Sequence, residues 1–363
     1  MSAQSSALNF NPAVAASSST RSRTLSLLLM LAIASVFWID SRYPALMKRY
    51  HAGTQVKASG ALTFGTVYAV DRSMPLATRV WRTTINWLDA NRIGMTFSFL
   101  FGPAALTFLA TLRRRRFKSR MLNTLFGALA GMPLAVCTNC IAPIARGLFA
   151  SGMSTESVLA AMFASPALNV VVLAMTFALF PASVALLKLA TVLFLILVFA
   201  PLAASRLRPE AAIIPCPIDI PVSETWSQAF AGVARSYAKS FWYVCRIALP
   251  FMLLAAVLGA LVIEALPAQA LIMPVTFSGI VLVALIAAFL PVPMAFDVAI
   301  AYVAWTHGVP LPYVVTVLCT LGIISVFSLS IVGKSISWKV AAAAYATVAI
   351  LGTIAGLISR SFV

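Results

Sequence analysis

Two cysteines, Cys137 and Cys140, are separated by two residues within a stretch that is otherwise as apolar as a membrane span. Prolines flank the pair at Pro133 and Pro143, and a basic residue, Arg146, follows. An irregular backbone at membrane depth is tolerated only against protein or a water-filled cavity, because hydrocarbon offers no hydrogen bonds. Thiols and a guanidinium group beside such a break therefore predict a functional site.

The chemistry of the thiol pair has three interpretations. Thiolates are soft ligands that suit trivalent arsenic, Cu(I) or zinc, so Cys137 and Cys140 could bind a thiophilic solute. Two cysteines do not complete the four-ligand set of a structural zinc site, and we predict no metal or other cofactor. The pair could instead act as a redox dithiol, or both residues could be small apolar fillers of a packed core.

Other polar residues near the break are candidates for the same site. Asn139 could contact a solute or cap a half-helix, and capping is the simpler role. Arg146 is either a functional charge inside a span or a side chain that reaches the membrane surface. Ser165 and Pro166 interrupt the next span, and Asn169 follows one turn later, so this segment could form a second wall of the site.

Asp297 is the acid at the centre of a second interrupted apolar segment. A carboxylate buried there must either be protonated or be paired with a cation. The first case suits a proton or cation relay, and the second requires a partner such as Arg146 or Lys188. On its own, Lys188 lies near the end of a span, where we expect it to extend toward the surface.

Composition places the chain among multi-pass membrane proteins. It has 363 residues, of which 61% are hydrophobic and 10% charged, whereas soluble domains are about 25% charged. The net charge of +17 is best explained by Lys and Arg in cytoplasmic loops, and no nucleic-acid-binding motif is present. No nucleotide-binding or common metalloenzyme motif is present either, so we predict that the protein is not an enzyme.

The pattern of apolar runs divides the chain into six parts. We predict a disordered N-terminus (1–23), an N-terminal span (24–40), an extramembrane loop with an amphipathic helix (41–91), a first transmembrane repeat (92–206), a cytoplasmic linker (207–231) and a second transmembrane repeat (232–363).

Each repeat contains an interrupted segment, at 121–152 and at 275–307, that is longer than the about 20 residues needed to cross a bilayer. If both segments re-enter as hairpins, the basic stretches 113–120 and 206–246 lie on one side, as the positive-inside rule requires. Each repeat then has three full spans plus a hairpin, so the repeats are inverted. Paired interrupted segments of this kind indicate a transporter site.

The motif residues also resemble a known family. The series Cys137-Thr-Asn-Cys-Ile-Ala-Pro-Ile-Ala-Arg-Gly-Leu148, then Gly152, then Phe163-Ala-Ser-Pro-Ala-Leu-Asn169, is similar to the signature of the predicted-permease family. That family includes bacterial methylarsenite-efflux permeases, the ArsP- and YraQ-like proteins. The resemblance is specific from Gly131 to Val172 and diffuse elsewhere, and the second interruption lacks the cysteine that the family often has.

We therefore predict an all-α polytopic protein of two inverted repeats, each with three spans and a re-entrant hairpin, plus an N-terminal span. The predicted function is a secondary permease of the bacterial inner membrane that exports a small thiophilic solute, such as a trivalent organoarsenical or a soft metal. The alternatives are a membrane thiol oxidoreductase that uses Cys137 and Cys140, and a channel or scaffold subunit without a solute.

Overall fold

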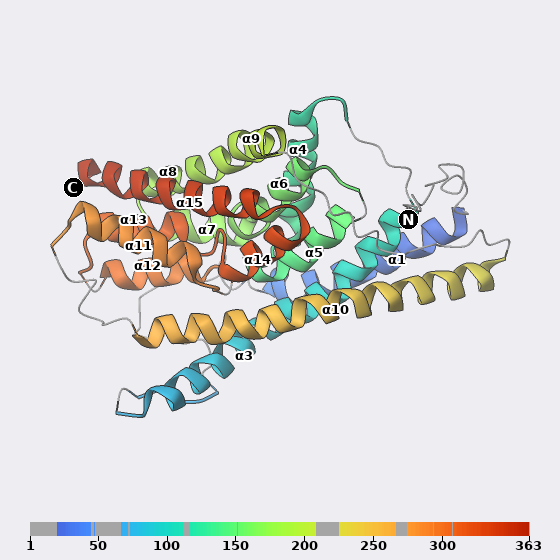
Figure 1. Cartoon of the computed structure of the whole chain (residues 1–363), viewed down its shortest axis with the longest axis horizontal. Helices are drawn as coiled ribbons and strands as arrows, with labels where there is room; N and C mark the ends of the chain where they lie inside the picture. Colours follow the sequence, from blue (N-terminus) through green and yellow to red (C-terminus); the bar gives the residue numbers. More distant parts are fainter. Residues whose placement is uncertain are drawn as a thin grey trace, which may run out of the picture.

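The computed structural model describes residues 20–44, 47, 67–71, 73–111, 117–150, 152–207, 225–265, 274–292, 294–306 and 308–362. Within these ranges all regular elements are helices, and no β-strand is formed. The helices form an elongated bundle, with the C-terminus at one end of the long axis and the start of α1 toward the other (Figure 1). The prediction of an all-α membrane protein is confirmed.

Three helices that line one side of the bundle are longer than the sequence patterns indicate. They are α1 (Thr20–Phe37), which continues as a π-helical turn Trp38–Arg42, α3 (Leu76–Ala110) and α10 (Trp226–Ala265). The amphipathic segment 76–91 is therefore not a separate surface helix, because it is the first half of α3. Similarly, α1 begins before residue 24, and α10 begins inside the segment assigned to the linker.

The two long helices α3 and α10 pack side by side and run in opposite directions. Arg79, near the start of α3, forms an ion pair with Glu264 at the end of α10, with Nε and Oε2 2.8 Å apart. Further along α3, the Leu100 carbonyl accepts a hydrogen bond from the Tyr237 hydroxyl of α10 at 3.2 Å. The end of α3 and the start of α10 consequently lie at the same end of the bundle.

The same series of elements follows each long helix. After α3 come α4 (Arg120–Gly131), a 3-10 turn (Met132–Leu134), α5 (Thr138–Ala150), α6 (Thr155–Ala167), α7 (Val170–Leu179), α8 (Ala182–Phe194), a π-helical turn (Leu195–Phe199) and α9 (Ala200–Arg206). After α10 come α11 (Phe277–Phe289), α12 (Phe296–Thr306), α13 (Leu311–Thr320), α14 (Val326–Ser335), α15 (Trp338–Ile358) and a 3-10 turn (Ser359–Phe362).

Backbone conformation repeats along with the helices. Ala135 and Ala295, which precede α5 and α12, have positive φ angles of 46° and 64°. Gly152 and Gly308, which follow the same two helices, have φ angles of 91° and 84°. Left-handed backbone is uncommon for a residue with a side chain. Its occurrence at matching places indicates that both interruptions are specific features of the fold.

The first interrupted segment is a helical hairpin. Asn123 of α4 donates to Glu156 of α6 at 2.9 Å, and the Val136 N–H, beyond the end of α4, donates to Ser165 near the end of α6 at 3.2 Å. The earlier residue of the α4 segment contacts the earlier residue of α6, and the later contacts the later, so α4 and α6 run parallel. The connecting helix α5 must therefore run back, antiparallel to both.

The second interrupted segment has the same course. The Tyr313 hydroxyl of α13 donates to the Pro274 carbonyl just before α11 at 3.1 Å. At the other end, Val292 lies beside Gly322, beyond the ends of α11 and α13. These helices are thus parallel, and α12 returns between them. In Figure 1, α11, α12 and α13 lie toward the C-terminal end of the molecule, and α4, α5 and α6 lie toward the opposite end.

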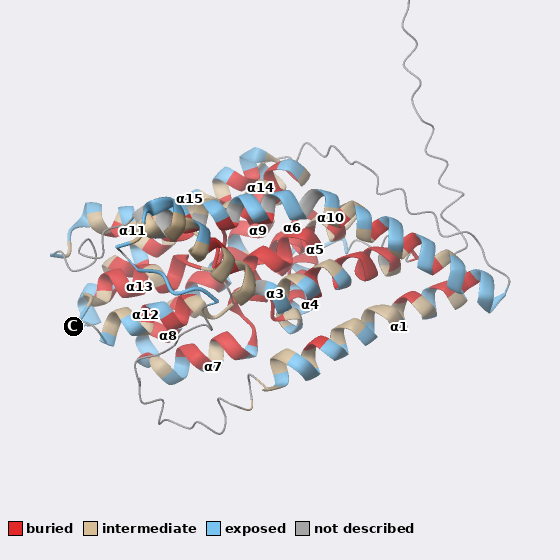
Figure 2. Ribbon diagram, turned by 90° about the horizontal axis from the view of Figure 1, so that it is seen from below, coloured by how far each residue is buried: buried red, intermediate tan, exposed pale blue. Residues whose placement is uncertain are grey.

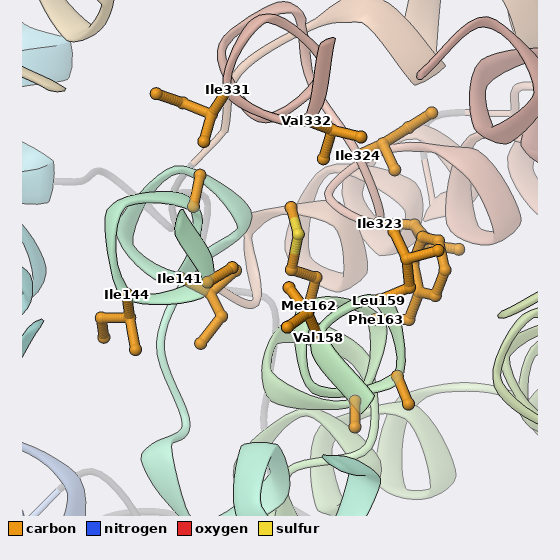
Figure 3. Close-up of a cluster of buried hydrophobic side chains, with 14 of the residues drawn as sticks. Ile141, Ile144, Val158, Leu159, Met162, Phe163, Ile323, Ile324, Ile331 and Val332 are labelled. Carbon is orange, nitrogen blue, oxygen red and sulfur yellow. The ribbon is translucent and has the colours of Figure 1, made fainter. Parts of the chain in front are cut away.

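Membrane-spanning character is distributed over several elements. By length and hydropathy, Thr20–Arg42, Ala182–Arg206 and Trp338–Phe362 can each cross a bilayer. Together, α6 and α7 are also long and apolar enough, as a broken span or a re-entrant loop bent by 46°. Buried residues concentrate along the inner faces of the helices, whereas many outer faces expose large apolar side chains (Figure 2). The largest buried cluster joins α5 and α6 of the first repeat to the 321–325 connection and α14 of the second (Figure 3).

Some sequence-based predictions lie outside the described residues. They concern residues 1–19 of the N-terminus predicted to be disordered, residues 45–46 and 48–66 of the predicted loop 41–91, the basic residues 113–116, residues 208–224 of the predicted linker, with Cys216, and residues 266–273.

Candidate functional site

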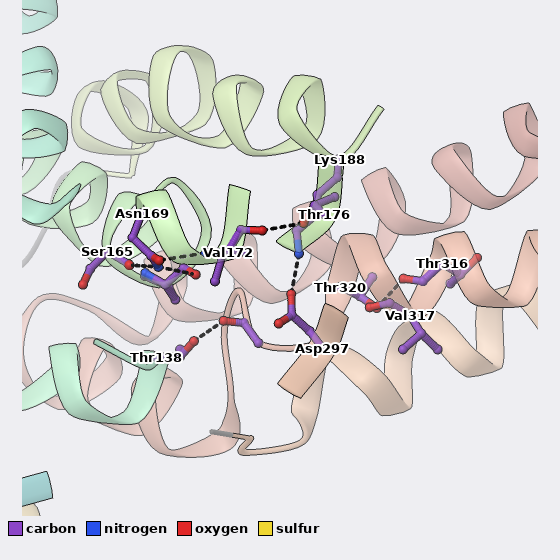
Figure 4. Close-up of polar contacts among 12 residues, drawn as sticks. Thr138, Ser165, Asn169, Val172, Thr176, Lys188, Asp297, Thr316, Val317 and Thr320 are labelled. Carbon is purple, nitrogen blue, oxygen red and sulfur yellow. Dashed lines mark hydrogen bonds and ion pairs between the residues drawn. The ribbon is translucent and has the colours of Figure 1, made fainter. Parts of the chain in front are cut away.

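The interruptions of the two repeats meet at one place in the bundle. Thr138, the first residue of α5, donates its hydroxyl hydrogen bond to the Gly322 carbonyl, in the connection between α13 and α14. Gly322 also lies against Asp297, because a Cβ atom added at this glycine would be 3.4 Å from the aspartate side chain. Figure 4 shows Thr138, Ser165, Asn169 and Asp297 around this junction, although they come from α5, α6, the bend between α6 and α7, and α12.

Cys137 acts as the N-terminal cap of α5. The Cys140 N–H lies 3.2 Å from the Cys137 sulfur and 3.0 Å from its carbonyl oxygen, so Cys137 accepts the hydrogen bonds that the first helical turn leaves open. Just before it, Ser165 binds both the N–H and the carbonyl of Val136. The thiol is thereby fixed at the positive end of the helix dipole, which favours a negatively charged sulfur.

Cys140 lies one turn further along α5 and is fully buried. Its carbonyl accepts a hydrogen bond from the Ser98 hydroxyl of α3 at 2.5 Å. A Cβ atom at Gly94 of α3 would lie 2.9 Å from the Cys140 sulfur, so the glycine leaves the room that this sulfur occupies. Both cysteines are free thiols.

Asn139 connects the two repeats and does not cap its own helix. Its Oδ1 accepts a hydrogen bond from the Ser325 hydroxyl at 2.7 Å. Ser325 in turn caps α14 through a reciprocal capping box with Ser328. Asn139 is 1% exposed, yet its Nδ2 has no hydrogen-bond partner among the residues that the structure describes. A buried N–H donor without an acceptor is rare in native proteins and is expected where a ligand supplies the acceptor.

Asn169, by contrast, has a capping role. Its side chain accepts the Val172 N–H at 3.0 Å at the start of α7 and donates to the Ser165 carbonyl at 2.8 Å. It therefore repairs the backbone at the bend between α6 and α7, where Pro166 interrupts the helix. Ser165 and Asn169 are both fully buried beside the first hairpin.

Asp297 is paired with Lys188. The Lys188 ammonium nitrogen lies 2.5 Å from Asp297 Oδ2, and the two side chains are 2% and 9% exposed. The expectation that Lys188 extends to the surface is therefore wrong. Packing of α8 places Lys188 inside the bundle, where a buried ammonium group requires an opposite charge beside it. The pair links α8 of the first repeat to the first turn of α12 in the second.

Arg146 and Pro143 lie away from this junction. Arg146 is half-buried, and its guanidinium group contacts Tyr243 of α10, with nitrogen-to-hydroxyl distances of 3.2 and 3.3 Å. It therefore does not pair with Asp297. Pro143 is buried inside α5 and removes one N–H from that helix.

The end of α1, which precedes the predicted first repeat, contacts the first interruption. The Trp38 indole N–H donates to the Pro133 carbonyl at 2.7 Å. One turn later, the guanidinium carbon of Arg42 lies over the Phe37 ring, 4.6 Å from its centre. Its Nε is buried without a hydrogen-bond partner.

Several of these residues were not identified from the sequence. Thr138 and Ser325 are small polar residues whose partners lie about half the chain away, and spacing alone gives no sign of such contacts. A signal for Lys188 did exist, because a buried acid in one repeat requires a buried base elsewhere. Arg42 follows a predicted span and resembles an ordinary basic flank.

The junction combines soft ligands with positive electrostatics. The helices α5, α7, α12 and α14 all begin at the interruptions, so four helix N-termini point toward the same region. Such termini favour negative charge, as does the N–H donor of the Asn139 amide. The arrangement is chemically suited to hold a thiophilic solute that also carries acceptor atoms.

Comparison with known proteins gives the family. Residues 104–361 match the family model described as "Predicted permease", which is more than two thirds of the chain. The chain belongs to this permease family. It is 27% identical over 254 residues to the UPF0718 protein YraQ of Escherichia coli strain K12, covering 70% of this chain and 71% of YraQ. No solved structure matches the chain. The protein is thus a multi-pass membrane permease, and α1 and most of α3 lie before the matched region.

Proposed function

We propose that this permease moves a small thiophilic solute, with Cys137 and Cys140 as its soft ligands. The observation that carries the proposal is the position of the two free thiols. They lie at the start of a half-helix, where the two interrupted segments meet, beside an amide donor that has no partner among the described residues. Soft thiolate ligands favour trivalent arsenic and soft metal ions over hard cations.

The proposed transport mechanism is alternating access between two inverted repeats. Three features support it: α3 and α10 are antiparallel, each repeat contains a hairpin, and the hairpins lie toward opposite ends of the molecule. Interrupted helices that meet at the centre of paired repeats are typical of secondary transporters. Because both thiols are buried, solute exchange requires the repeats to separate.

The ion pair between Lys188 and Asp297 is the proposed closing contact of this cycle. It joins the two repeats directly, and Gly322 connects it to the first turn of α5. While the pair is intact, Asp297 is held as a fixed charge and not as a proton carrier. Proton coupling through Asp297 would require the pair to open during transport, and it stays a prediction.

The remaining site residues have proposed supporting roles. Ser165 and Asn169 hold the walls of the site, because they complete the backbone hydrogen bonds of the interruptions. Arg146 fixes α5 against α10 through Tyr243. We further propose that the protein resides in a bacterial inner membrane and exports its solute, as expected from the resemblance to methylarsenite-efflux permeases.

A membrane thiol oxidoreductase is the second candidate, and one observation favours it. The Cys140 N–H donates to the Cys137 sulfur at 3.2 Å at the start of α5, and a thiol at a helix N-terminus is activated in many redox dithiols. The two functions differ in what the thiols do. A permease needs them as ligands and leaves them reduced, whereas an oxidoreductase cycles them through a disulfide.

Cells that lack the protein provide the test. They are complemented with the wild type, Cys137→Ser, Cys140→Ser or the double variant, and their resistance to a trivalent organoarsenical and to soft metal ions is measured. We expect each serine variant to lose resistance while its membrane level is unchanged. Wild-type resistance in all three variants would exclude the thiol-ligand proposal. A Cys137–Cys140 disulfide that forms during turnover would favour the oxidoreductase.

A further inference from the structure

A groove with a volume of about 620 Å³ runs between α1 and α3, and we call it the α1–α3 groove. Helix α1 lies along the edge of the bundle (Figure 2). Two lining residues, Val36 and Ile93, are 59% and 53% exposed, so the groove is open at the outer surface. Its volume lies in the range of about 300–1,000 Å³ that is typical of small-molecule sites.

The two helices that form the α1–α3 groove run in opposite directions. Arg21, near the start of α1, has its guanidinium carbon 5.7 Å from the centre of the Trp226 ring at the start of α10. The start of α10 lies at the same end of the bundle as the end of α3, so α1 is antiparallel to α3. Phe37 and Phe97 stack at 3.9 Å and are both buried, and they close the groove on its inner side.

This groove is charged at one end and mainly apolar along the rest of its length. Asp40 and Ser41, late in α1, line the charged end together with Arg92, which comes early in the α3 wall. Because the walls are antiparallel, the other end is formed by Ala32 and Leu100. A site of this shape suits an amphiphile whose polar group carries charges of both signs.

The charged side chains at this end remain accessible to a ligand. Arg92 is 72% exposed, and its Nη1 lies 2.9 Å from Asp89 in a pair of the kind that contributes little to stability. Its other guanidinium N–H groups are additional donors for an anion. Asp40 is exposed and takes part in no ion pair among the residues that the structure describes.

The depth of the α1–α3 groove matches one leaflet of a bilayer. The membrane-spanning segment Thr20–Arg42 ends two residues beyond Asp40, so the charged end lies near the boundary with water. From Asp40 to Ala32 the helix rises about 12 Å. That distance is most of one half of the about 30 Å hydrocarbon core.

We propose that the α1–α3 groove binds a phospholipid whose zwitterionic head group carries a primary amine, as in phosphatidylethanolamine. Arg92 donates hydrogen bonds to the phosphate, Asp40 accepts them from the ammonium group, and an acyl chain lies along the apolar part. A head group with only a negative charge leaves Asp40 without a partner and is repelled by it. A quaternary ammonium group offers Asp40 no N–H donor. The bound lipid fastens α1 to α3.

The test is native mass spectrometry of the purified full-length protein, titrated with phosphatidylethanolamine, phosphatidylglycerol or phosphatidylcholine of identical acyl chains. We expect the wild type to bind phosphatidylethanolamine roughly tenfold more tightly than phosphatidylglycerol, the effect of one charge-assisted hydrogen bond. Asp40→Asn should reduce the affinity for phosphatidylethanolamine to that for phosphatidylglycerol. Arg92→Gln should weaken binding of all three lipids by roughly tenfold, because each has a phosphate.

A matched control and a groove-filling variant place the lipid in the α1–α3 groove. Asp89→Asn removes the ion pair with Arg92 but keeps Arg92 itself, so it should not weaken lipid binding. Thr96→Trp fills the middle of the groove from an exposed position of α3 and should abolish the preference for phosphatidylethanolamine. If Thr96→Trp does not accumulate in the membrane, Ile93→Trp takes its place.

Three results would overturn the proposal. These are equal affinity of the wild type for phosphatidylethanolamine and phosphatidylglycerol, wild-type lipid preference in the groove-filling variant, and a wild type that binds none of the three lipids. A dimer that persists in place of bound lipid would assign the groove to a second copy of the chain. Replacing Cys137 by Ser should leave lipid binding unchanged, so the lipid site and the thiol-ligand function succeed or fail separately.

Discussion

Replacing Asp297 by Asn should destabilise the protein substantially, because it leaves the Lys188 ammonium buried without a counter-charge. The two groups are 2.5 Å apart, and their side chains are 2% and 9% exposed. Breaking a buried ion pair by removing one partner typically costs about 3–5 kcal/mol, since the remaining charge keeps its desolvation penalty. At roughly 2 °C per kcal/mol for a large chain, the melting temperature should fall by about 6–10 °C.

The assay is thermal unfolding of the purified protein in detergent, followed by intrinsic tryptophan fluorescence. The chain offers a matched control in Asp89→Asn, because Asp89 forms an exposed ion pair with Arg92, in which the side chains are 30% and 72% exposed. Exposed pairs contribute only about 0.2–1 kcal/mol, so this control should shift the melting temperature by about 2 °C or less. The double variant Lys188→Met/Asp297→Leu removes both charges and should recover most of the lost stability.

The reasoning is refuted if Asp297→Asn melts no lower than Asp89→Asn, or if the double variant is as unstable as the sum of its single changes. The same variant also tests the relay hypothesis. A relay requires Asp297→Asn to fold normally and to transport solute without dependence on the pH gradient. A variant that is both stable and normal in pH dependence would remove either role for Asp297.

Three further predictions follow from the geometry. Gly94→Val places a new Cβ atom 2.9 Å from the Cys140 sulfur, so the variant should reduce resistance to organoarsenicals while its membrane level stays normal. Unaltered resistance would mean that the packing of Gly94 against Cys140 is unimportant. Gly322→Ala, at a φ of +79°, should lower stability by about 1–3 kcal/mol in thermal unfolding, and a neutral effect would contradict the close approach to Asp297. Cysteines introduced at Lys118 and Trp226 should react with an impermeant maleimide from the same side of the membrane, and labelling from opposite sides would exclude the hairpin topology.

The main features of the fold are predictable from composition and from the two interrupted segments. Gly152 and Gly308 follow the helices that end the two interrupted segments, and both have the positive φ angles that end a helix. Apolar periodicity could not show that 76–91 continues into α3, because a change from amphipathic to apolar pattern resembles a boundary between elements. The basic flank of α1 likewise gave no indication of its contact with the first hairpin.

Only part of the candidate site was predicted from the sequence. The thiols, Asn139 and Asp297 were identified because unusual residues in an apolar segment stand out. Lys188 was one of two partners considered for Asp297, but the contact of Asn139 with Ser325 and that of Thr138 with Gly322 became visible only when the chain was folded, since each joins residues more than a hundred positions apart. Lys188 shows the physical reason: the depth of a charged residue depends on how its helix packs, and not on its distance from the end of an apolar run.

Transport in reconstituted vesicles tests the central claim most directly. Purified wild-type protein and the Cys137→Ser/Cys140→Ser variant are placed in lipid vesicles, and the movement of a trivalent organoarsenical across the bilayer is measured without any redox partner. The thiol-ligand account predicts transport by the wild type and none above the protein-free background by the variant. Equal transport by both proteins would contradict the account, and Cys137 and Cys140 would then be packing residues of the first hairpin.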